Sequence, residues 1–180
     1  MKNTDKKKMQ RVAIIGSCGA GKSTLARKLG EKLALPVIHL DAYYWQKGWQ
    51  ECDRHKWEKI QQNLIKGARW IIDGNYDSSM DIRLSAADTI IWLDFNRYLC
   101  LWRVLNRYLR YSGRTRPDMA AECPERLNWE FIKYVWNFPK LHRFRIINKL
   151  GKYQTSKQII ILQKHQQVLN LLYSNNAAAE

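Results

Sequence analysis

Short apolar runs alternate along the chain with longer stretches in which apolar residues recur every three to four positions. The runs predict β-strands and the longer stretches predict amphipathic helices. The expected strands are Arg11–Ile15, Pro36–Leu40, Arg69–Ile72, Thr89–Leu93 and Gln158–Leu162. The expected helices are Lys22 to about Leu33, Asp53–Lys66, Arg97 to about Arg110, helical material over Pro124–Leu150 with a break at Pro139, and Gln163–Tyr173. Strands separated by helices indicate an α/β domain around a mostly parallel, five-stranded sheet.

The length of 180 residues favours a single domain, with residues 1–10 and 175–180 as flexible ends. No apolar run approaches the roughly 20 residues that a membrane span needs. The lysine-rich N-terminus lacks the apolar core of a secretory signal. We therefore expect a cytoplasmic protein without a membrane partner, whose four cysteines are free thiols.

The segment from Gly16 to Ser23 matches the phosphate-binding loop (P-loop) pattern G-x-x-x-x-G-K-[ST] at every fixed position. A predicted strand precedes it and a predicted helix follows, as the motif requires. The loop amides and the positive helix N-terminus suit phosphates, Lys22 can reach the β- and γ-phosphates, and the Ser23 hydroxyl can ligate Mg²⁺. ATP and Mg²⁺ are thus the predicted cofactors. The expected nucleotide contacts are Gly16, Ser17, Cys18, Gly19, Ala20, Gly21, Lys22, Ser23 and Thr24.

Aspartates close three of the predicted strands, at Asp41, Asp73 and Asp94. Ligands of open α/β sheets bind beyond the carboxyl ends of the strands, so these side chains are expected to face one crevice. A P-loop needs a carboxylate for the magnesium shell, often through water. We assign Ser23 and Asp73 to the metal, with Asp94 as the alternative to Asp73.

Asp41 precedes an aromatic stretch that includes Tyr43, Tyr44 and Trp45. Its carboxylate can accept a proton from an acceptor hydroxyl, orient an acceptor or help to hold magnesium. The neighbouring rings can stack on a planar acceptor, and equally they can be core or interface residues. We predict catalytic and acceptor-binding roles for Asp41 and an acceptor contact for Tyr44.

The net charge of +15 indicates anionic partners, and arginines are concentrated in one region. Six arginines and no acidic residue lie between Phe95 and Pro117. Arg103, Arg107 and Arg110 share one face of the predicted helix, which leads into a polar segment, about 111–118, that we expect to form a lid. Phosphates would offset the repulsion among these charges. The alternative is a solvated basic face. The residues predicted to act in phosphoryl transfer are Lys22, Asp41, Arg110, Arg114 and Arg116.

Taken together, these motifs give the chain a resemblance to the bacterial DNA-topology-modulation proteins, which are adenylate-kinase-like P-loop proteins. It covers roughly residues 11–165. The segments that carry it are the P-loop, Pro36–Asp41, Trp45–Trp49, Trp70–Tyr76, Ala87–Arg97, Cys100–Asp118, Cys123–Arg126 and Trp129–Pro139. The resemblance implies a nucleoside-monophosphate-kinase-like P-loop NTPase fold of three layers with strand order 2-3-1-4-5. It also implies a lid near Arg110–Arg116 and an acceptor-binding segment after the second strand.

The chain departs from adenylate kinases after Asp73-Gly74, where Asn75-Tyr76 replaces a Phe-Pro-Arg-type segment whose arginine grips the acceptor phosphate. Arg83 is the nearby substitute we consider. The segment Leu40–Tyr44 is similar to the Asp-x-Phe-Tyr-type segment of uridine kinases, in which the aspartate serves the acceptor hydroxyl. AMP is therefore not fixed as the acceptor. The predicted acceptor contacts are Asp41, Tyr44, Asp73, Gly74, Asn75, Arg83 and Arg107.

The sequence thus predicts an ATP-dependent phosphotransferase acting on a small-molecule acceptor: a nucleoside, a nucleotide or another small hydroxyl or phosphate compound. One alternative is a nucleotide-dependent DNA-binding regulator, supported by the positive charge and by aromatics interleaved with basic residues over Trp129–Arg145. Another is a nucleotide-binding regulator that hydrolyses ATP poorly. Either a monomer or a homodimer is compatible with the sequence.

Overall fold

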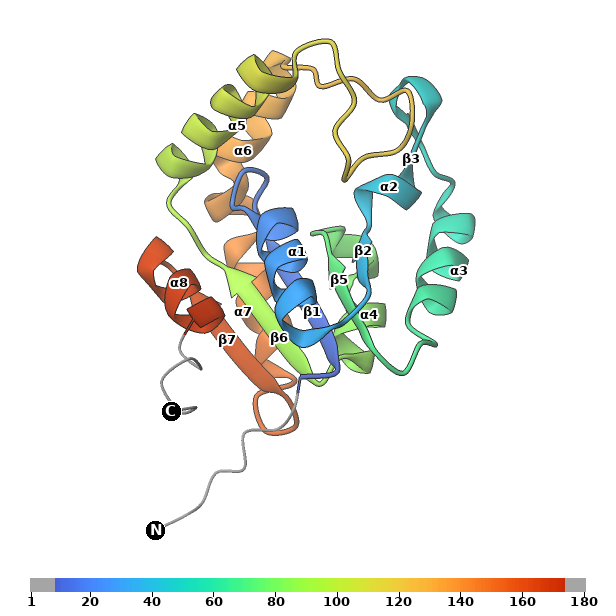
Figure 1. Ribbon diagram of the computed structural model, residues 1–180, viewed down its shortest axis with the longest axis vertical. Coiled ribbons are helices and arrows are strands. Elements are labelled where there is room, and N and C mark those ends of the chain that lie inside the picture. The colour runs from blue at the N-terminus through green and yellow to red at the C-terminus, as the bar shows by residue number, and fades with distance from the viewer. Residues whose placement is uncertain (1–8, 174–180) are drawn as a thin grey trace.

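The computed structural model describes residues 9–173 and has a five-stranded parallel sheet at its centre (Figure 1). The order across the sheet is β2-β5-β1-β6-β7, and each neighbouring pair is parallel. Counting these strands alone along the chain gives 2-3-1-4-5, as predicted. The strands are β1 (Arg11–Gly16), β2 (Val37–His39), β5 (Trp70–Asp73), β6 (Thr89–Leu93) and β7 (Gln158–Leu162).

Helices flank this sheet and extend beyond its carboxyl edge. They are α1 (Lys22–Leu33), α2 (Asp41–Tyr44), α3 (Arg54–Leu64), α4 (Met80–Ala86), α5 (Arg97–Tyr111), α6 (Trp129–Leu141), α7 (Arg143–Gly151) and α8 (His165–Tyr173). Short 3₁₀ turns lie at Lys47–Trp49 and Asp77–Ser79, and a small antiparallel hairpin joins β3 (Trp45–Gln46) to β4 (Gln50–Glu51). The long helices α5 and α6 rise side by side beyond the edge of the sheet where β1 ends (Figure 1).

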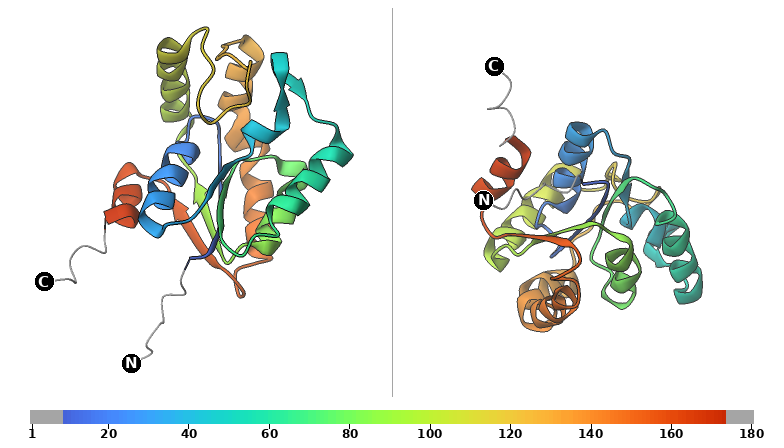
Figure 2. Two further views of the ribbon diagram at one scale, coloured as in Figure 1. Left: turned by 45° about the vertical axis from the view of Figure 1, so that its right-hand side comes forward. Right: turned by 90° about the horizontal axis from the view of Figure 1, so that it is seen from below.

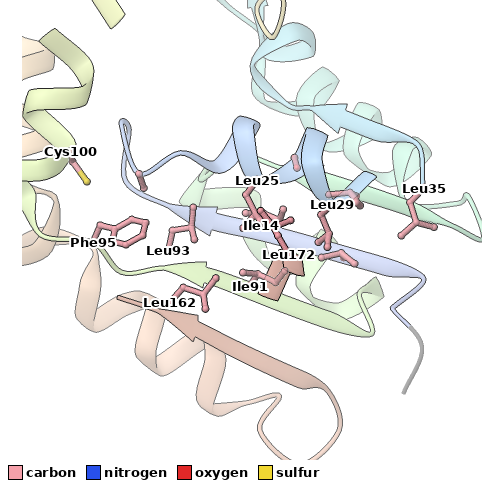
Figure 3. Close-up of a cluster of buried hydrophobic side chains, with 14 of the residues drawn as sticks. Ile14, Leu25, Leu29, Leu35, Ile91, Leu93, Phe95, Cys100, Leu162 and Leu172 are labelled. Atoms are coloured by element: carbon pink, nitrogen blue, oxygen red, sulfur yellow. The ribbon is translucent and has the colours of Figure 1, made fainter. Parts of the chain in front are cut away.

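The alternation of side chains along β1 divides the core into two layers. Val12 and Ile14 belong to one buried cluster, while Ala13 and Ile15 belong to another on the opposite face of the sheet. α1 and α8 cover the first face with residues such as Leu29 (Figure 3), and α3, α4 and α7 cover the second (Figure 2). Because both faces are covered, the central strands are apolar throughout, which explains their short continuous apolar runs.

Two predicted boundaries in the second half of the chain are wrong. Helix was expected from Pro124, but α6 begins at Trp129, because the preceding segment pairs with the lid through bridges such as Thr115 to Pro124. The helix starts only where the Asn128 side chain accepts a hydrogen bond from the Phe131 amide. Pro139 was expected to break the helix, but it lies inside α6, and the chain passes from α6 to α7 at His142.

The predicted chain ends fall mostly outside the described residues, namely at positions 1–8 and 174–180. Gln10, which is described, is tied to the sheet: its carbonyl accepts from the Trp70 amide at 2.8 Å. Among residues 9–173, no helix combines the length and apolar character that crossing a bilayer requires.

Candidate functional site

The P-loop leaves the carboxyl end of β1 between two neighbouring strands. Ile14 is in register with Asp73 of β5, and Gly16 with Leu93 of β6. The loop then enters α1 at Lys22, after Gly21 in a left-handed conformation (φ 94°). The N-terminus of a twelve-residue helix therefore points at the space above the sheet, which favours an anion there.

The loop is held from the side by α5. A Cβ at Gly19, whose φ is +77°, would lie 2.2 Å from the Cys100 carbonyl oxygen. Arg103 donates from Nη1 to the Ala20 carbonyl oxygen at 3.1 Å. Close packing and a charged hydrogen bond thus fix the conformation of the loop, and α5 becomes part of the site.

Lys22 is positioned over its own loop. Its Nζ donates to the Ser17 carbonyl oxygen at 2.9 Å, and the structure gives it no ion pair within the described residues. Such a lysine can exchange this neutral partner for phosphate oxygens, for which it has a stronger attraction.

A cavity of about 750 Å³ lies over the loop, a volume typical of small-ligand sites. Most of the predicted site residues form its wall. They are Cys18, Gly19, Ala20, Gly21, Lys22, Ser23, Thr24, Asp41, Asp73, Gly74, Arg107, Arg110 and Arg116. The cavity thus brings together residues from the P-loop, three strand ends and the lid region.

Asp73 is buried at the end of β5 and pairs with His39 at the end of β2, with 2.6 Å between Oδ1 and Nδ1. Burial acts to lower the pKa of His39, but the hydrogen bond and charge of Asp73 outweigh it, and the pKa is raised. His39 was predicted to be a packed strand residue, yet it also lines the cavity.

Asp41 begins α2 and accepts a hydrogen bond from the Tyr76 hydroxyl at 2.7 Å. Burial, and next the charge of Asp41, raise the pKa of Tyr76, so the phenol keeps its proton and donates. Cys18 lies nearby, and burial raises the pKa of its thiol. Tyr76 belongs to the segment that stands where adenylate kinases carry a Phe-Pro-Arg-type sequence. Its contact with Asp41 was not predicted.

Asp94 lies away from the cavity. It is held by Arg143, whose Nη2 is 3.1 Å from Oδ2, and by the Gln163 amide at 3.0 Å. Of Asp73 and its alternative Asp94, only Asp73 lines the cavity, as Asp41 also does. No group of three or more His, Cys, Asp or Glu side chains in residues 9–173 is arranged to hold a metal by itself. Ser23 and Asp73 both line the cavity, and their hydroxyl and carboxylate oxygens are donors of the kind that Mg²⁺ prefers.

Arg116 of the lid and Arg107 of α5 are neutralised by carboxylates that lie just beyond the arginine run. Arg107 and Arg116 both pair with the buried Glu125, at 2.8 and 2.7 Å, and Arg116 also pairs with Asp118 at 2.8 Å. The sequence argument missed Glu125 and Asp118 because it considered charge within one window of the chain. The bridge between Ser112 and Glu125 shows how a loop brings these distant positions together.

Asp118 also reaches the P-loop. Burial acts to raise the pKa of Asp118, but the charge of Arg116 and a hydrogen bond with Ser23 outweigh it, and the pKa is lowered. A charged carboxylate from the lid thus lies against the hydroxyl that we assign to magnesium.

Six predicted site residues do not line the cavity: Gly16, Ser17, Tyr44, Asn75, Arg83 and Arg114. Asn75 supports the P-loop, because its Oδ1 accepts a hydrogen bond from the Gly16 amide at 3.3 Å. Tyr44 packs against Trp57 and Tyr76, and its hydroxyl donates to Glu51 at 3.0 Å.

Arg83 is fully buried and donates to the Gly74 carbonyl oxygen and to Gln61, each at 3.0 Å. The structure therefore places it in the core, where it supports Gly74, rather than at a position from which it could bind an acceptor phosphate. Arg114 is exposed on the lid.

No family profile and no curated protein matches the chain. Solved structures do resemble it. The shikimate kinase from Acinetobacter baumannii, determined in complex with shikimate, has a TM-score of 0.52 and 14% sequence identity, over 95% of this chain and 97% of that chain. The shikimate kinase from Bacteroides thetaiotaomicron gives 0.48 and 19%, over 92% and 96%. A sugar kinase from Janibacter sp. HTCC2649 gives 0.49 and 16%, over 92% of both chains.

At these identities the likeness concerns the fold, which the chain shares with the Acinetobacter structure at a TM-score above 0.5. None of these structures bears on the resemblance to the DNA-topology-modulation proteins, which stays a prediction. The chain therefore has the fold of the P-loop small-molecule kinases, with a five-stranded parallel sheet and the P-loop at its centre.

Proposed function

We propose that this protein is a Mg²⁺-dependent kinase that transfers the γ-phosphoryl group of ATP to a hydroxyl group of a small molecule. The observation that carries the proposal is that one cavity contains both the P-loop and Asp41. A P-loop alone serves binding or hydrolysis equally well. A carboxylate facing the phosphate end of the same cavity provides a group that can accept the proton of an attacking hydroxyl.

In this proposal the triphosphate lies along the P-loop, with Lys22 at the β- and γ-phosphates. Ser23 and Asp73 would hold Mg²⁺ directly or through water, and the ion would supply positive charge to offset the charge that develops on the phosphates. Arg103 and Arg110, which line the cavity from α5, stabilise the transferring group. Trp102 and His165 lie on the same side and are the candidates for contact with the base.

The acceptor binds between Asp41 and the lid. Tyr76 donates to Asp41 Oδ1 and leaves the other carboxylate oxygen for the acceptor hydroxyl. The lid, which carries Arg116 and Asp118, covers the reacting groups and excludes water from the phosphate.

A panel of nucleosides, nucleotides, sugars and small alcohols, assayed with Mg-ATP for acceptor-dependent ADP formation, tests the proposal. We expect one chemical class to raise ADP formation well above the rate without acceptor. Asp41→Asn should lower kcat for that acceptor by about 100-fold or more while the Kd for ATP stays within about threefold. Absence of acceptor-dependent ADP formation across the panel would contradict the kinase proposal.

DNA binding is the second candidate, because helices α6 and α7 expose aromatic and basic side chains together. Trp129 is 75% exposed and Phe144 is 69% exposed, and the exposed Lys133 and Lys140 lie between them in sequence. Buried residues such as Val135 and Ile146 show that the same helices also pack on the domain. DNA binding would require an affinity that falls steeply with salt concentration, and no binding near physiological ionic strength would exclude it.

A further inference from the structure

The charges that line the cavity are divided unevenly between its two sides. We call the side formed by the P-loop, by α1 and by Arg103 and Arg110 of α5 the donor side. Its cationic side chains are Lys22, Arg27, Lys28, Arg103 and Arg110. None of them forms an ion pair within residues 9–173. Uncompensated positive charge on this side suits a triphosphate.

We call the side formed by the ends of β2 and β5, by α2, by the lid and by Arg107 of α5 the acceptor side. Three of the cationic groups that line the cavity belong to it, and each is paired with a carboxylate. His39 pairs with Asp73 at 2.6 Å. Arg107 pairs with Glu125, and Arg116 pairs with both Glu125 and Asp118.

Carboxylates outnumber guanidinium groups on the acceptor side. Asp41, Asp73 and Asp118 line it, and Glu125 lies directly behind it. Asp41 receives a hydrogen bond from the neutral Tyr76 hydroxyl and no ion pair in the described part of the chain. The acceptor side is therefore neutral to negative, even when His39 is protonated.

Arg107 and Arg116 cannot easily leave their carboxylate partners to bind another anion. Glu125 has only 2% of its side chain exposed, so removing Arg107 or Arg116 from it would leave a carboxylate buried without a counter-charge. Arg83, the other nearby cation, is held in the core by Gly74 and Gln61. Among the described residues that line the cavity, the acceptor side consequently offers hydrogen-bond acceptors and a general base, but no cation that is free to bind a phosphate or a carboxylate. Arg114 of the lid is exposed and does not line the cavity.

We infer that the acceptor is an electrically neutral hydroxyl compound, such as a nucleoside or an unphosphorylated sugar. Nucleoside monophosphates, sugar phosphates and carboxylic acids are rejected. The inference rests on the proposed function and narrows its acceptor. A negatively charged acceptor would approach Asp41, which has no ion pair within residues 9–173, on a side whose three cations are already paired with carboxylates. Like charges brought together in a site of this kind are strongly disfavoured. In the reaction, the acceptor oxygen bonds to the γ-phosphorus, the bond to the β-γ bridging oxygen breaks, ADP leaves, and Asp41 takes the hydroxyl proton.

The test compares matched pairs of acceptors with Mg-ATP: nucleosides and their 5′-monophosphates, hexoses and their 6-phosphates, and polyols and the corresponding acids. We expect kcat/KM for the neutral member of the active pair to exceed that of the anionic member by at least about 100-fold. A kcat/KM that is equal or higher for the anionic member overturns the inference but leaves the kinase proposal standing. Absence of turnover with every pair overturns the kinase proposal, and the inference with it.

Charge variants test whether the carboxylates cause the preference. In Asp118→Asn, the ratio of neutral to anionic kcat/KM should fall by about tenfold, because one negative charge leaves the acceptor side. Glu125→Gln should lower the ratio in the same direction and serves as the second variant if the first does not fold. The exposed Glu130, at the start of α6, provides the matched control, and Glu130→Gln should leave the ratio unchanged. An unchanged ratio in folded Asp118→Asn and Glu125→Gln would show that charge on the acceptor side does not select the acceptor.

Discussion

At the scale of single residues, Lys22 is the side chain whose environment is most directly suited to phosphate. It is partly buried, is bonded to a backbone carbonyl oxygen of its own loop and has unpaired cations around it. Repulsion from Arg103 and Arg110 makes this cluster unfavourable without an anion. A bound triphosphate relieves that repulsion. The free energy of nucleotide binding therefore includes this relief in addition to the individual contacts.

Lys22→Ala should therefore abolish ATP turnover, with a fall of about 1000-fold or more, while leaving the fold intact. The lysine makes one hydrogen bond, so its loss should change the free energy of unfolding by less than about 1 kcal/mol. Phosphoryl-transfer kinetics and denaturant unfolding measure the two effects. Retained activity in the variant would mean that the assignment of Lys22 is wrong.

The pair of His39 and Asp73 makes stability depend on pH. The folded-state pKa of His39 lies above its ordinary value of 6.5, so the pair contributes fully below that value and loses its contribution as pH rises through the folded pKa. We expect the difference in unfolding free energy between wild type and His39→Asn to be larger at about pH 6 than at about pH 8. Titrations shared by both proteins cancel in this difference. Equal differences at the two pH values would show that the pair does not link stability to proton binding.

At the scale of elements, the contact between the P-loop and α5 decides whether the loop keeps its shape. Glycine is required at position 19 for two reasons: its positive φ and the nearby Cys100 carbonyl oxygen. No side chain can be added there unless the loop or the helix moves.

Gly19→Ala should lower the free energy of unfolding by about 2 kcal/mol and weaken ATP binding by at least about tenfold. Gly151→Ala is the matched control, since nothing lies within 4 Å of a Cβ at that position. Its unfolding free energy should stay within about 0.5 kcal/mol of wild type. Calorimetry with an ATP analogue and denaturant unfolding report both quantities, and equal effects of the two substitutions would contradict the packing argument.

Elements with a strong local pattern were predicted from the sequence, and elements defined by long-range contacts were not. Each of the five strands is an apolar run, and α1 carries its leucines on one stripe, so their positions follow from periodicity. The segment after Asp41 gave no such signal, because α2 and the β3–β4 hairpin are very short. The hairpin is also held from outside: the Gly48 amide donates to the Glu122 carbonyl oxygen, and the Trp49 indole donates to that of Pro124.

The candidate site, like the fold, was predicted only where its residues belong to a local sequence feature. The P-loop and the aspartate that ends β5 follow from a fixed motif and a strand end, both of which are local features. Glu125 could not be found by the same reasoning, because it meets Arg107 and Arg116 only when the chain beyond the lid folds back on α5. The assignment of Arg83 failed for the opposite reason, since proximity in sequence did not reveal that its side chain is buried.

At the scale of the whole molecule, the sheet order places β1 between β5 and β6, and this order separates Asp73 from Asp94. Asp73, at the end of β5, lines the cavity, whereas Asp94, which follows β6, is bonded to Arg143 and Gln163 and does not line it. The excess positive charge is also distributed so that the donor side of the cavity keeps five cations without carboxylate partners in residues 9–173.

Nucleotide affinity should therefore depend on ionic strength. Raising monovalent salt from about 50 to about 300 mM should increase the Kd for Mg-ATP by about fivefold or more, because screening weakens the attraction of exposed cations such as Arg27 and Arg110. The combined variant Arg27→Gln and Arg110→Gln should show a smaller increase. A Kd that does not change with salt would mean that the surrounding charge does not contribute to binding.

The most direct test of the central claim follows the γ-phosphoryl group itself. ATP labelled at the γ-phosphate is incubated with the protein, Mg²⁺ and the matched acceptor pairs, and the label is then located. We predict that label appears in an organic phosphate ester formed from a neutral hydroxyl compound, that Lys22→Ala abolishes it, and that Asp41→Asn lowers its rate of formation by about 100-fold or more. Label that appears only in inorganic phosphate, at a rate independent of every acceptor, would contradict the account and identify the protein as an ATP hydrolase.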